Sequence, residues 1–124
     1  MTSKKPSILI VEDEGLIALH LRELLQKSGY DVTDAVPSGE DALTCLEASI
    51  PDLVIMDITL NGKLDGIETA RKIRKRSDIP IIFLSAHPES KRLMATEDIA
   101  PYGFLGKPYV LSEVISAVEK ALHR

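Results

Sequence analysis

Three apolar runs in this sequence, and a weaker fourth, end directly on residues that carry a charge or a hydroxyl group. The residues at these ends are Glu12 with Asp13, Asp57, Ser85 and Lys107. Short apolar runs bounded by turn-forming residues are typical of strands buried on both faces of a parallel sheet. The carboxyl ends of parallel strands meet at one edge, where open α/β sheets bind ligands. We therefore expect three carboxylates, a hydroxyl and an ammonium group to converge there.

Three carboxylates at one edge need a compensating cation. Two ionised carboxylates about 4 Å apart repel by roughly 4 kcal/mol at an effective dielectric of 20. Mg²⁺ suits such a site, because it binds one or two carboxylates together with waters and phosphate oxygens. Asp57 stands alone at the tip of a central strand, which favours it as a phosphoryl acceptor. Lys107 and Ser85 would then bind a tetrahedral anion, by charge and by a hydrogen bond.

The elements that must position these residues alternate strand and helix five times. Predicted strands cover 7–11, 31–36, 51–57, 80–84 and 104–106, and predicted helices cover 15–28, 38–46, 65–76, 89–98 and 111–122. In the first helix, an apolar stripe includes Leu16, Leu21 and Leu25, and residues 58–64 are predicted to form a polar loop. The pattern predicts an α/β fold, a doubly wound five-stranded parallel sheet in the flavodoxin-like order 2-1-3-4-5 with helices on both faces.

Composition limits the class of protein. The 124 residues predict one domain over residues 1–124, and the formal net charge of -4 argues against a direct nucleic-acid partner. The single cysteine, Cys45, cannot form an intramolecular disulfide, which suits a reducing cytosol. No apolar run approaches the roughly 18 residues that a membrane span needs. We expect a soluble cytoplasmic protein without a membrane partner.

Taken together at these intervals, the polar residues at the strand ends resemble a known family. Glu12-Asp13, Asp57, Ser85-Ala86 and Lys107-Pro108 are similar to the motifs of the receiver domain of two-component response regulators, and the resemblance covers essentially the whole chain. It implies a signalling domain, not an enzyme, which assists its own phosphorylation and dephosphorylation. Its partners would be a sensor histidine kinase or phosphotransfer protein and a downstream protein target. Whether it forms a homodimer is left open.

The resemblance also implies a role for each site residue. Asp57 would accept the phosphoryl group, and Asp13, Asp57 and the main-chain carbonyl of Thr59 would ligate Mg²⁺, with Glu12 acting through metal-bound water. Ser85 and Lys107 would bind phosphoryl oxygens. Phe104 would be the aromatic switch residue that turns inward when Ser85 moves, altering the surface of the fourth helix, fifth strand and fifth helix. The Lys107-Pro108 peptide bond would be cis.

The sequence departs from the family pattern at three places. Family members often have proline four residues and glycine eight residues after the acceptor. Here Asn61 and Gly66 stand four and nine residues after Asp57, so the loop is one residue longer than usual. The switch position is phenylalanine where tyrosine is common, and Tyr102, on the same strand face, is a candidate to replace the missing hydroxyl. The segment 97–102 replaces the usual small connection before the fifth strand. We therefore expect an unusual signalling surface around the fourth helix.

Simpler interpretations compete with these roles. Glu12 and Asp13 could cap the first helix, Ser85 could bond its own backbone, and Lys107 could be a solvated charge. His87 is either an ordinary loop histidine or a modulator that overlooks the phosphoryl site. Thr59 is a second candidate modulator, because its side chain would border, with His87, the approach of water to Asp57.

Three other functions are also open. A haloacid-dehalogenase-like phosphatase would need a second aspartate where Thr59 stands, and the anionic segment after the first strand argues against a flavodoxin-like binder of a nucleotide or flavin. The third is a phosphorylation-independent interaction module on the receiver fold.

Overall fold

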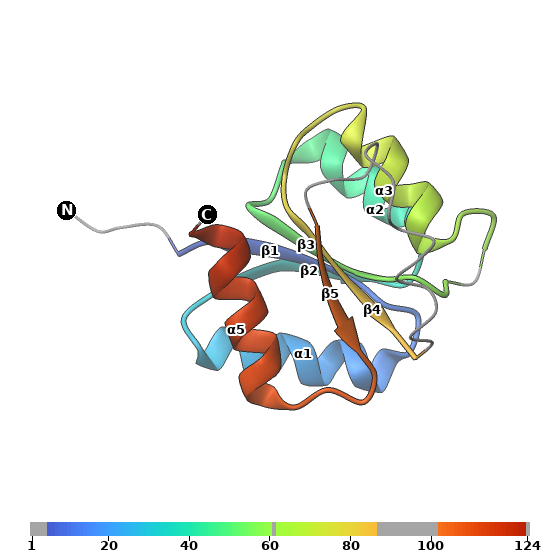
Figure 1. Ribbon diagram of the computed structural model, residues 1–124. Coiled ribbons are helices and arrows are strands. Elements are labelled where there is room, and N and C mark those ends of the chain that lie inside the picture. The colour runs from blue at the N-terminus through green and yellow to red at the C-terminus, as the bar shows by residue number, and fades with distance from the viewer. Residues whose placement is uncertain (1–4, 61, 87–101, 124) are drawn as a thin grey trace.

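Five parallel strands form the centre of the molecule. The computed structural model describes residues 5–60, 62–86 and 102–123. Its strands are β1 (Ser7–Val11), β2 (Asp31–Val36), β3 (Leu53–Asp57), β4 (Ile81–Ser85) and β5 (Tyr102–Gly106). They lie in the order β2-β1-β3-β4-β5 (Figure 1), which confirms the predicted doubly wound α/β fold.

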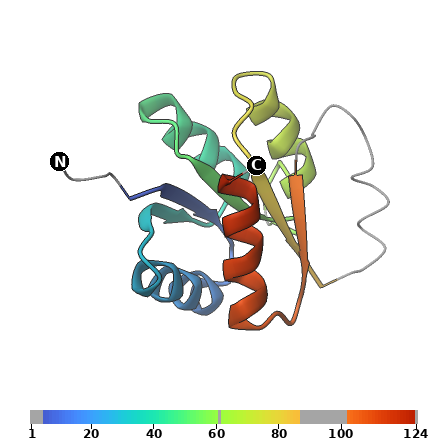
Figure 2. The same cartoon turned by 60° about the vertical axis from the view of Figure 1, so that its left-hand side comes forward.

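Helices cover both faces of this sheet. Those in the described part of the chain are α1 (Gly15–Lys27), α2 (Gly39–Ala48), α3 (Gly66–Arg74) and α5 (Leu111–Leu122). Helices α1 and α5 lie on one face, and α2 and α3 lie on the other (Figures 1 and 2). The helix predicted over 89–98 lies outside the described residues. Right-handed crossovers between parallel strands place consecutive helices in this way.

The alternation of side chains along the strands divides the core into two clusters. Leu9, Val54 and Phe83 pack toward α2 and α3, whereas Ile8, Ile55 and Ile82 pack toward α1 and α5. Every residue of β3 and β4 is buried, as expected for strands covered on both faces. The burial of β3 continues to its last residue, so Asp57 lies at the edge of the sheet at the end of a fully buried strand.

Two local expectations were wrong, and one helix boundary differs. The loop over 58–64 is not uniformly polar, because Ile58 and Leu60 are buried in the α2 and α3 core. Leu16 does not belong to the buried stripe of α1, since it is 81% exposed. Helix α3 also ends at Arg74, two residues earlier than expected, where the Arg74 guanidinium donates to the carbonyls of Ser77 and Ile79.

Candidate functional site

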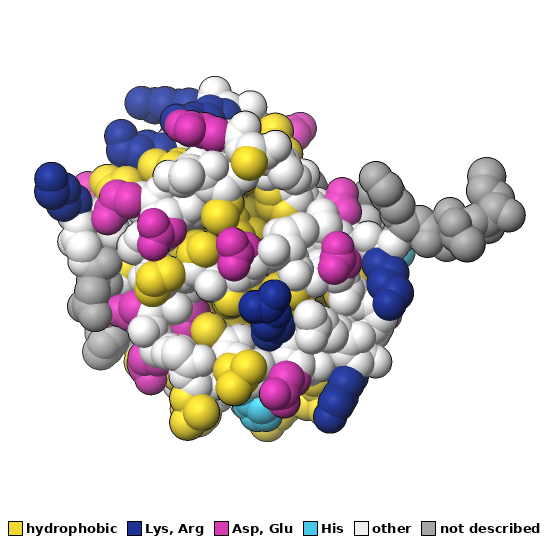
Figure 3. Space-filling model, turned by 180° about the vertical axis from the view of Figure 1, so that it is seen from behind, with side chains coloured by type: hydrophobic (Ala, Val, Ile, Leu, Met, Phe, Trp, Pro, Cys, Tyr) yellow, Lys and Arg dark blue, Asp and Glu magenta, His cyan; other side chains and the backbone are white. Residues whose placement is uncertain are grey.

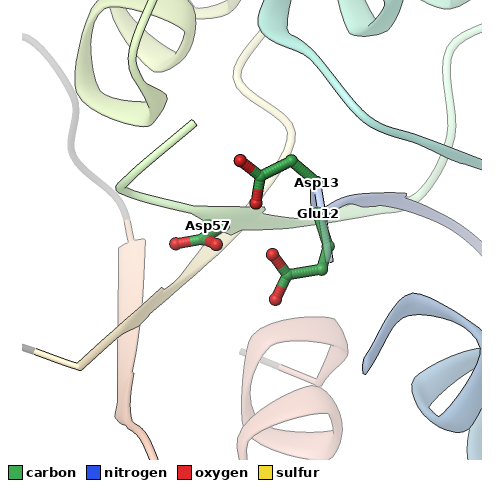
Figure 4. Close-up of side chains that lie close together, drawn as sticks. All are labelled: Glu12, Asp13 and Asp57. Atoms are coloured by element: carbon green, nitrogen blue, oxygen red, sulfur yellow. The ribbon is translucent and has the colours of Figure 1, made fainter. Parts of the chain in front are cut away.

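The three predicted carboxylates do meet at the carboxyl edge of the sheet. Glu12 and Asp13 follow β1, and Asp57 ends β3, which is the hydrogen-bonded neighbour of β1. One oxygen from each carboxylate lies within 4.8 Å of the others, and Figure 4 shows the three side chains grouped beyond the strand ends. Glu12 is 2% exposed and Asp57 4% exposed, while Asp13 is half-buried. The site is therefore a largely buried group of oxygen ligands.

Lys107 joins two of these carboxylates. Its Nζ donates to Glu12 Oε1 at 2.8 Å and to Asp57 Oδ2 at 3.2 Å. The Lys107 side chain is 15% exposed, so these ion pairs are mostly shielded from water. The Lys107 N–H donates to Ser85 O at 2.7 Å, and the Lys107-Pro108 peptide bond is cis, as the resemblance implied. Lys107 thus follows β5 and bridges to residues at the ends of β1 and β3.

Thr59 contacts Asp57 in a way that the sequence analysis missed. The Thr59 N–H donates to Asp57 Oδ1 at 3.0 Å, whereas the expected roles of Thr59 were those of its carbonyl and its side chain. Because Oδ2 accepts from Lys107, both oxygens of the Asp57 carboxylate have hydrogen-bond donors. The Thr59 side chain itself is exposed. Aspartate side chains commonly accept from the main-chain N–H two residues later, so Asp57 at the end of a strand was the signal that could have found this bond.

Burial and charge shift the protonation of this cluster. Burial raises the pKa of Glu12 to about 7, and the Asp57 carboxylate adds to this effect, while Lys107 opposes it. For Lys107, burial works to lower the pKa, but the hydrogen bond to Glu12 and the charge of Asp57 outweigh it, so the pKa is raised. Burial, followed by the charge of Glu12, also raises the pKa of Tyr109, a neighbour of the site that the sequence analysis did not name.

The predicted switch residues lie on the adjacent strands. Ser85 ends β4 and is 1% exposed, and its neighbour Leu84 pairs with Asp57 across the β3 and β4 ladder. Phe104 is half-buried on the face of the sheet that carries α2 and α3. Tyr102 lies on the same face and makes an edge-to-face contact with Phe83, with ring centroids 5.8 Å apart. His87 lies outside the described residues.

An apolar groove borders the site on the side of α1. Its lining includes Leu16, Leu19, Ala86, Pro108 and Tyr109, together with Lys107. Leu16 and Leu19 lie on the surface of the domain, where they are 81% and 52% exposed. In Figure 3, apolar side chains gather along the lower edge, where α1 runs, and basic side chains gather at the top over α3. The groove therefore joins an exposed apolar surface to Lys107.

Comparisons with known proteins agree with this arrangement. The sequence profile of the response regulator receiver domain matches residues 8–119, so the chain belongs to this family. The transcriptional regulatory protein PdtaR of Mycobacterium tuberculosis is 35% identical over 117 residues, which cover 94% of this chain and 57% of PdtaR. The chain thus spans little more than half the length of that relative.

Solved receiver structures match the fold closely. The receiver domain of a modulated diguanylate cyclase from Desulfovibrio desulfuricans G20 is 36% identical, with a TM-score of 0.86 over 97% of this chain and 95% of that chain. The receiver domain of NtrX from Brucella abortus is 29% identical, with a TM-score of 0.84 over 93% and 97% of the two chains. Among the described residues, no helix is long and apolar enough to cross a membrane. Family membership sets aside the dehalogenase-like and flavodoxin-like alternatives.

Proposed function

We propose that the chain is a single receiver domain over residues 1–124 that accepts a phosphoryl group on Asp57 from a phosphohistidine of a sensor kinase or phosphotransfer protein, with Mg²⁺. The observation that carries the proposal is the contact of Lys107 Nζ with both Glu12 and Asp57 inside a buried group of carboxylates. A cation placed there by a buried ion pair is positioned for an anion that forms on Asp57. If Glu12 and Asp13 only capped α1, no cation would be needed between Glu12 and Asp57.

The donor set fits a magnesium ion. All three side chains offer carboxylate oxygens, which are the ligands that hard divalent cations prefer, and one oxygen from each lies within 4.8 Å of the others. Asp13 and Asp57 would hold the ion directly with the Thr59 carbonyl, and Glu12 would hold it through water. When bound, Mg²⁺ would neutralise charge on the transferring phosphoryl oxygens. Lys107 alone offsets only part of the negative charge of this cluster.

The transfer itself needs little covalent chemistry from the protein. An oxygen of the Asp57 carboxylate forms a bond to phosphorus while the phosphorus–nitrogen bond of the phosphohistidine breaks, and its electron pair stays on the leaving imidazole nitrogen. Lys107 and the Ser85 hydroxyl then bind the phosphoryl oxygens. Positioning dominates such reactions. Hydrogen bonds to both Asp57 oxygens meet that requirement, because they fix the carboxylate in one orientation.

We assign the apolar groove beside α1 to the phosphodonor. A donor histidine must approach Asp57 from the carboxyl edge of the sheet, and the groove lined by Leu16, Leu19 and Tyr109 lies beside Lys107 at that edge. Large exposed apolar patches that are rimmed by polar residues are typical of protein interaction sites. The output surface would be β5 and α5 with the fourth helix, where Tyr102, Phe104 and Ser116 line a second groove.

Phosphorylation by a small-molecule donor tests the proposal. Wild type incubated with acetyl phosphate and Mg²⁺ should gain one phosphoryl group by intact mass, and the adduct should be labile to both acid and alkali. Asp57→Asn should gain none, while Asp78→Asn, which removes an exposed aspartate from the segment leading into β4, should behave as wild type. Equal gain by wild type and Asp57→Asn would show that Asp57 is not the acceptor. No gain by wild type would favour a phosphorylation-independent interaction module.

A further inference from the structure

Gly66, the first residue of α3, lies against the main chain of the proposed acceptor. The residue is buried, and a Cβ atom built on it would overlap the Asp57 carbonyl oxygen and lie 2.7 Å from Ile58 Cα. Real Cβ atoms do not approach backbone atoms so closely, and these atoms sit at the end of a fully buried strand. Glycine is therefore required where α3 begins, because no side chain fits between this helix and β3.

The same glycine holds a peptide group that reaches the Asp57 carboxylate. The Gly66 N–H donates to Ile58 O at 2.8 Å. That carbonyl shares its peptide group with the Thr59 N–H, which donates to Asp57 Oδ1 at 3.0 Å. Peptide groups are planar, so the directions of the C=O and N–H bonds are fixed relative to each other. The hydrogen bond made by Gly66 therefore helps to set the direction of the one that Asp57 receives.

Both ends of this connection are anchored. On the helix side, Asp65 and Glu68 form a reciprocal capping box, and the buried Thr69 hydroxyl donates to Asp65 O at 2.7 Å. On the sheet side, the Ile58 N–H donates to Leu84 O at 3.0 Å, which extends the ladder between β3 and β4. The peptide group between Ile58 and Thr59 is thus held from the sheet and from the start of α3.

We propose that Gly66 is a positioning residue for phosphoryl transfer: it lets α3 close on β3 and, through the Ile58–Thr59 peptide group, orients the Asp57 carboxylate. The inference rests on the proposed acceptor role of Asp57. It adds that the start of α3, whose side chains the transfer does not use, controls the angle at which Asp57 meets the phosphorus atom.

A pair of alanine substitutions separates positioning from packing. Gly66→Ala pushes α3 away from the Asp57 main chain. Leu25→Ala is the control for lost packing, because Leu25 is fully buried near the end of α1, in the core cluster on the other face of the sheet from α3. Both variants disturb the core, but only Gly66→Ala disturbs the contact of α3 with the main chain of Asp57 and Ile58. The rate of phosphorylation by acetyl phosphate is measured at saturating Mg²⁺, at a temperature where circular dichroism shows both variants to be folded.

Gly66→Ala should react at least about tenfold more slowly than wild type, since small misplacements of reacting groups cost up to about 100-fold in rate. Leu25→Ala should stay within about twofold of wild type by the same reasoning, because it leaves the start of α3 and Asp57 in place. A normal rate in Gly66→Ala, or an equal loss in both variants, would overturn the proposal. A wild type that accepts no phosphoryl group would instead refute the acceptor role of Asp57, and the inference would fall with it.

A second measurement needs no variant, so it decides the question even if Gly66→Ala does not fold. Phosphorylation of wild type changes the bonding of the Asp57 carboxylate, and the amide signals of Thr59 and Gly66 should then shift together in ¹H–¹⁵N spectra. The Gly39 amide, at the start of α2, serves as a reference glycine at a helix N-terminus, because the three atoms nearest to a Cβ built there belong to Thr69 and Leu64 and not to Asp57 or Ile58. A shift of Thr59 with Gly66 unchanged would overturn the proposal.

Discussion

The buried Glu12 carboxyl should make the metal-free protein less stable as the pH rises. Glu12 titrates near 4.5 in an unfolded chain, whereas burial and the Asp57 charge raise its pKa to about 7 in the fold, against the opposing effect of Lys107. Between these values the folded state binds more protons than the unfolded state, so the free energy of unfolding falls with rising pH. Each pH unit is worth about 1.4 kcal/mol, which gives about 3 kcal/mol over the whole interval and about 2 kcal/mol between pH 5.5 and 8.

Urea unfolding in EDTA at pH 5.5 and pH 8 measures this loss. Glu12→Gln should remove about 2 kcal/mol of the pH dependence, because glutamine keeps the shape but does not titrate. The comparison between variants cancels the contributions of groups that behave alike in both. Glu14→Gln, an exposed neighbour, is the matched control and should keep the wild-type slope.

Equal slopes in wild type and Glu12→Gln would refute the reasoning. They would mean that Lys107, at 2.8 Å, holds Glu12 ionised across the whole range, so that the repulsion from Asp57 is already offset without a proton or a metal. A slope of opposite sign would mean that the Glu12 pKa is lowered in the fold.

Three further outcomes are expected. Asp57→Asn should raise the melting temperature of the metal-free protein by relieving repulsion among the carboxylates. Mg²⁺ should stabilise wild type more than this variant by mass action, and equal Mg²⁺-induced shifts of the melting temperature in calorimetry would show that Asp57 is not a ligand. A phosphate mimic with Mg²⁺ should shift amide signals in β5 by favouring a state with Ser85 drawn inward and Phe104 buried, and unchanged signals would mean that this coupling is absent. His87→Ala should change the lifetime of phospho-Asp57 by at least about threefold, or roughly 0.7 kcal/mol in the barrier, with little change in Mg²⁺ affinity. If radiolabel decay gives the variant a wild-type lifetime, His87 is an ordinary loop residue.

The convergence of the site was predictable because it depends only on strand direction. Once the runs that end on Asp13, Asp57 and Lys107 are assigned to parallel strands of one sheet, their last residues must lie at the same edge. The bond from the Thr59 N–H to Asp57 needed a different argument, namely that aspartate side chains commonly accept from the N–H two residues later. The approach of Gly66 to the Asp57 carbonyl depends on the path of the loop that follows β3, and residue types in that loop do not determine its path.

The burial of this loop was missed for a related reason. Ile58 and Leu60 pack into the core between the sheet and α2 and α3, although Gly62 and Lys63 follow closely. The Leu64 N–H donates to Glu40 Oε1 at 3.1 Å, a contact between α2 and the loop that spans 24 residues of sequence. Such long-range contacts override a local polar pattern.

The exposure of Leu16, by contrast, could have been predicted. At 3.6 residues per turn, a residue five positions before Leu21 lies about 140° away around the helix axis, and Leu19 falls on the same side as Leu16. Leu21 is 1% exposed and Leu25 is fully buried, so they define the buried face of α1. The two leucines on the opposite face line the groove beside Lys107 that is proposed to receive the phosphodonor.

Lys107 contacts both the carboxylate site and Ser85, the predicted switch residue. Its Nζ contacts Glu12 and Asp57, while its own N–H donates to the carbonyl of Ser85 at the end of β4. A phosphoryl group on Asp57 would compete with Glu12 for the same ammonium group, because its oxygens carry more negative charge than a carboxylate. We expect a movement of Lys107 toward that group to reach β5, which ends at Gly106, and Tyr109 in the groove beside α1. The proposed signal therefore needs no long chain of contacts: one lysine connects the acceptor to both the output strand and the surface where the donor is expected to bind.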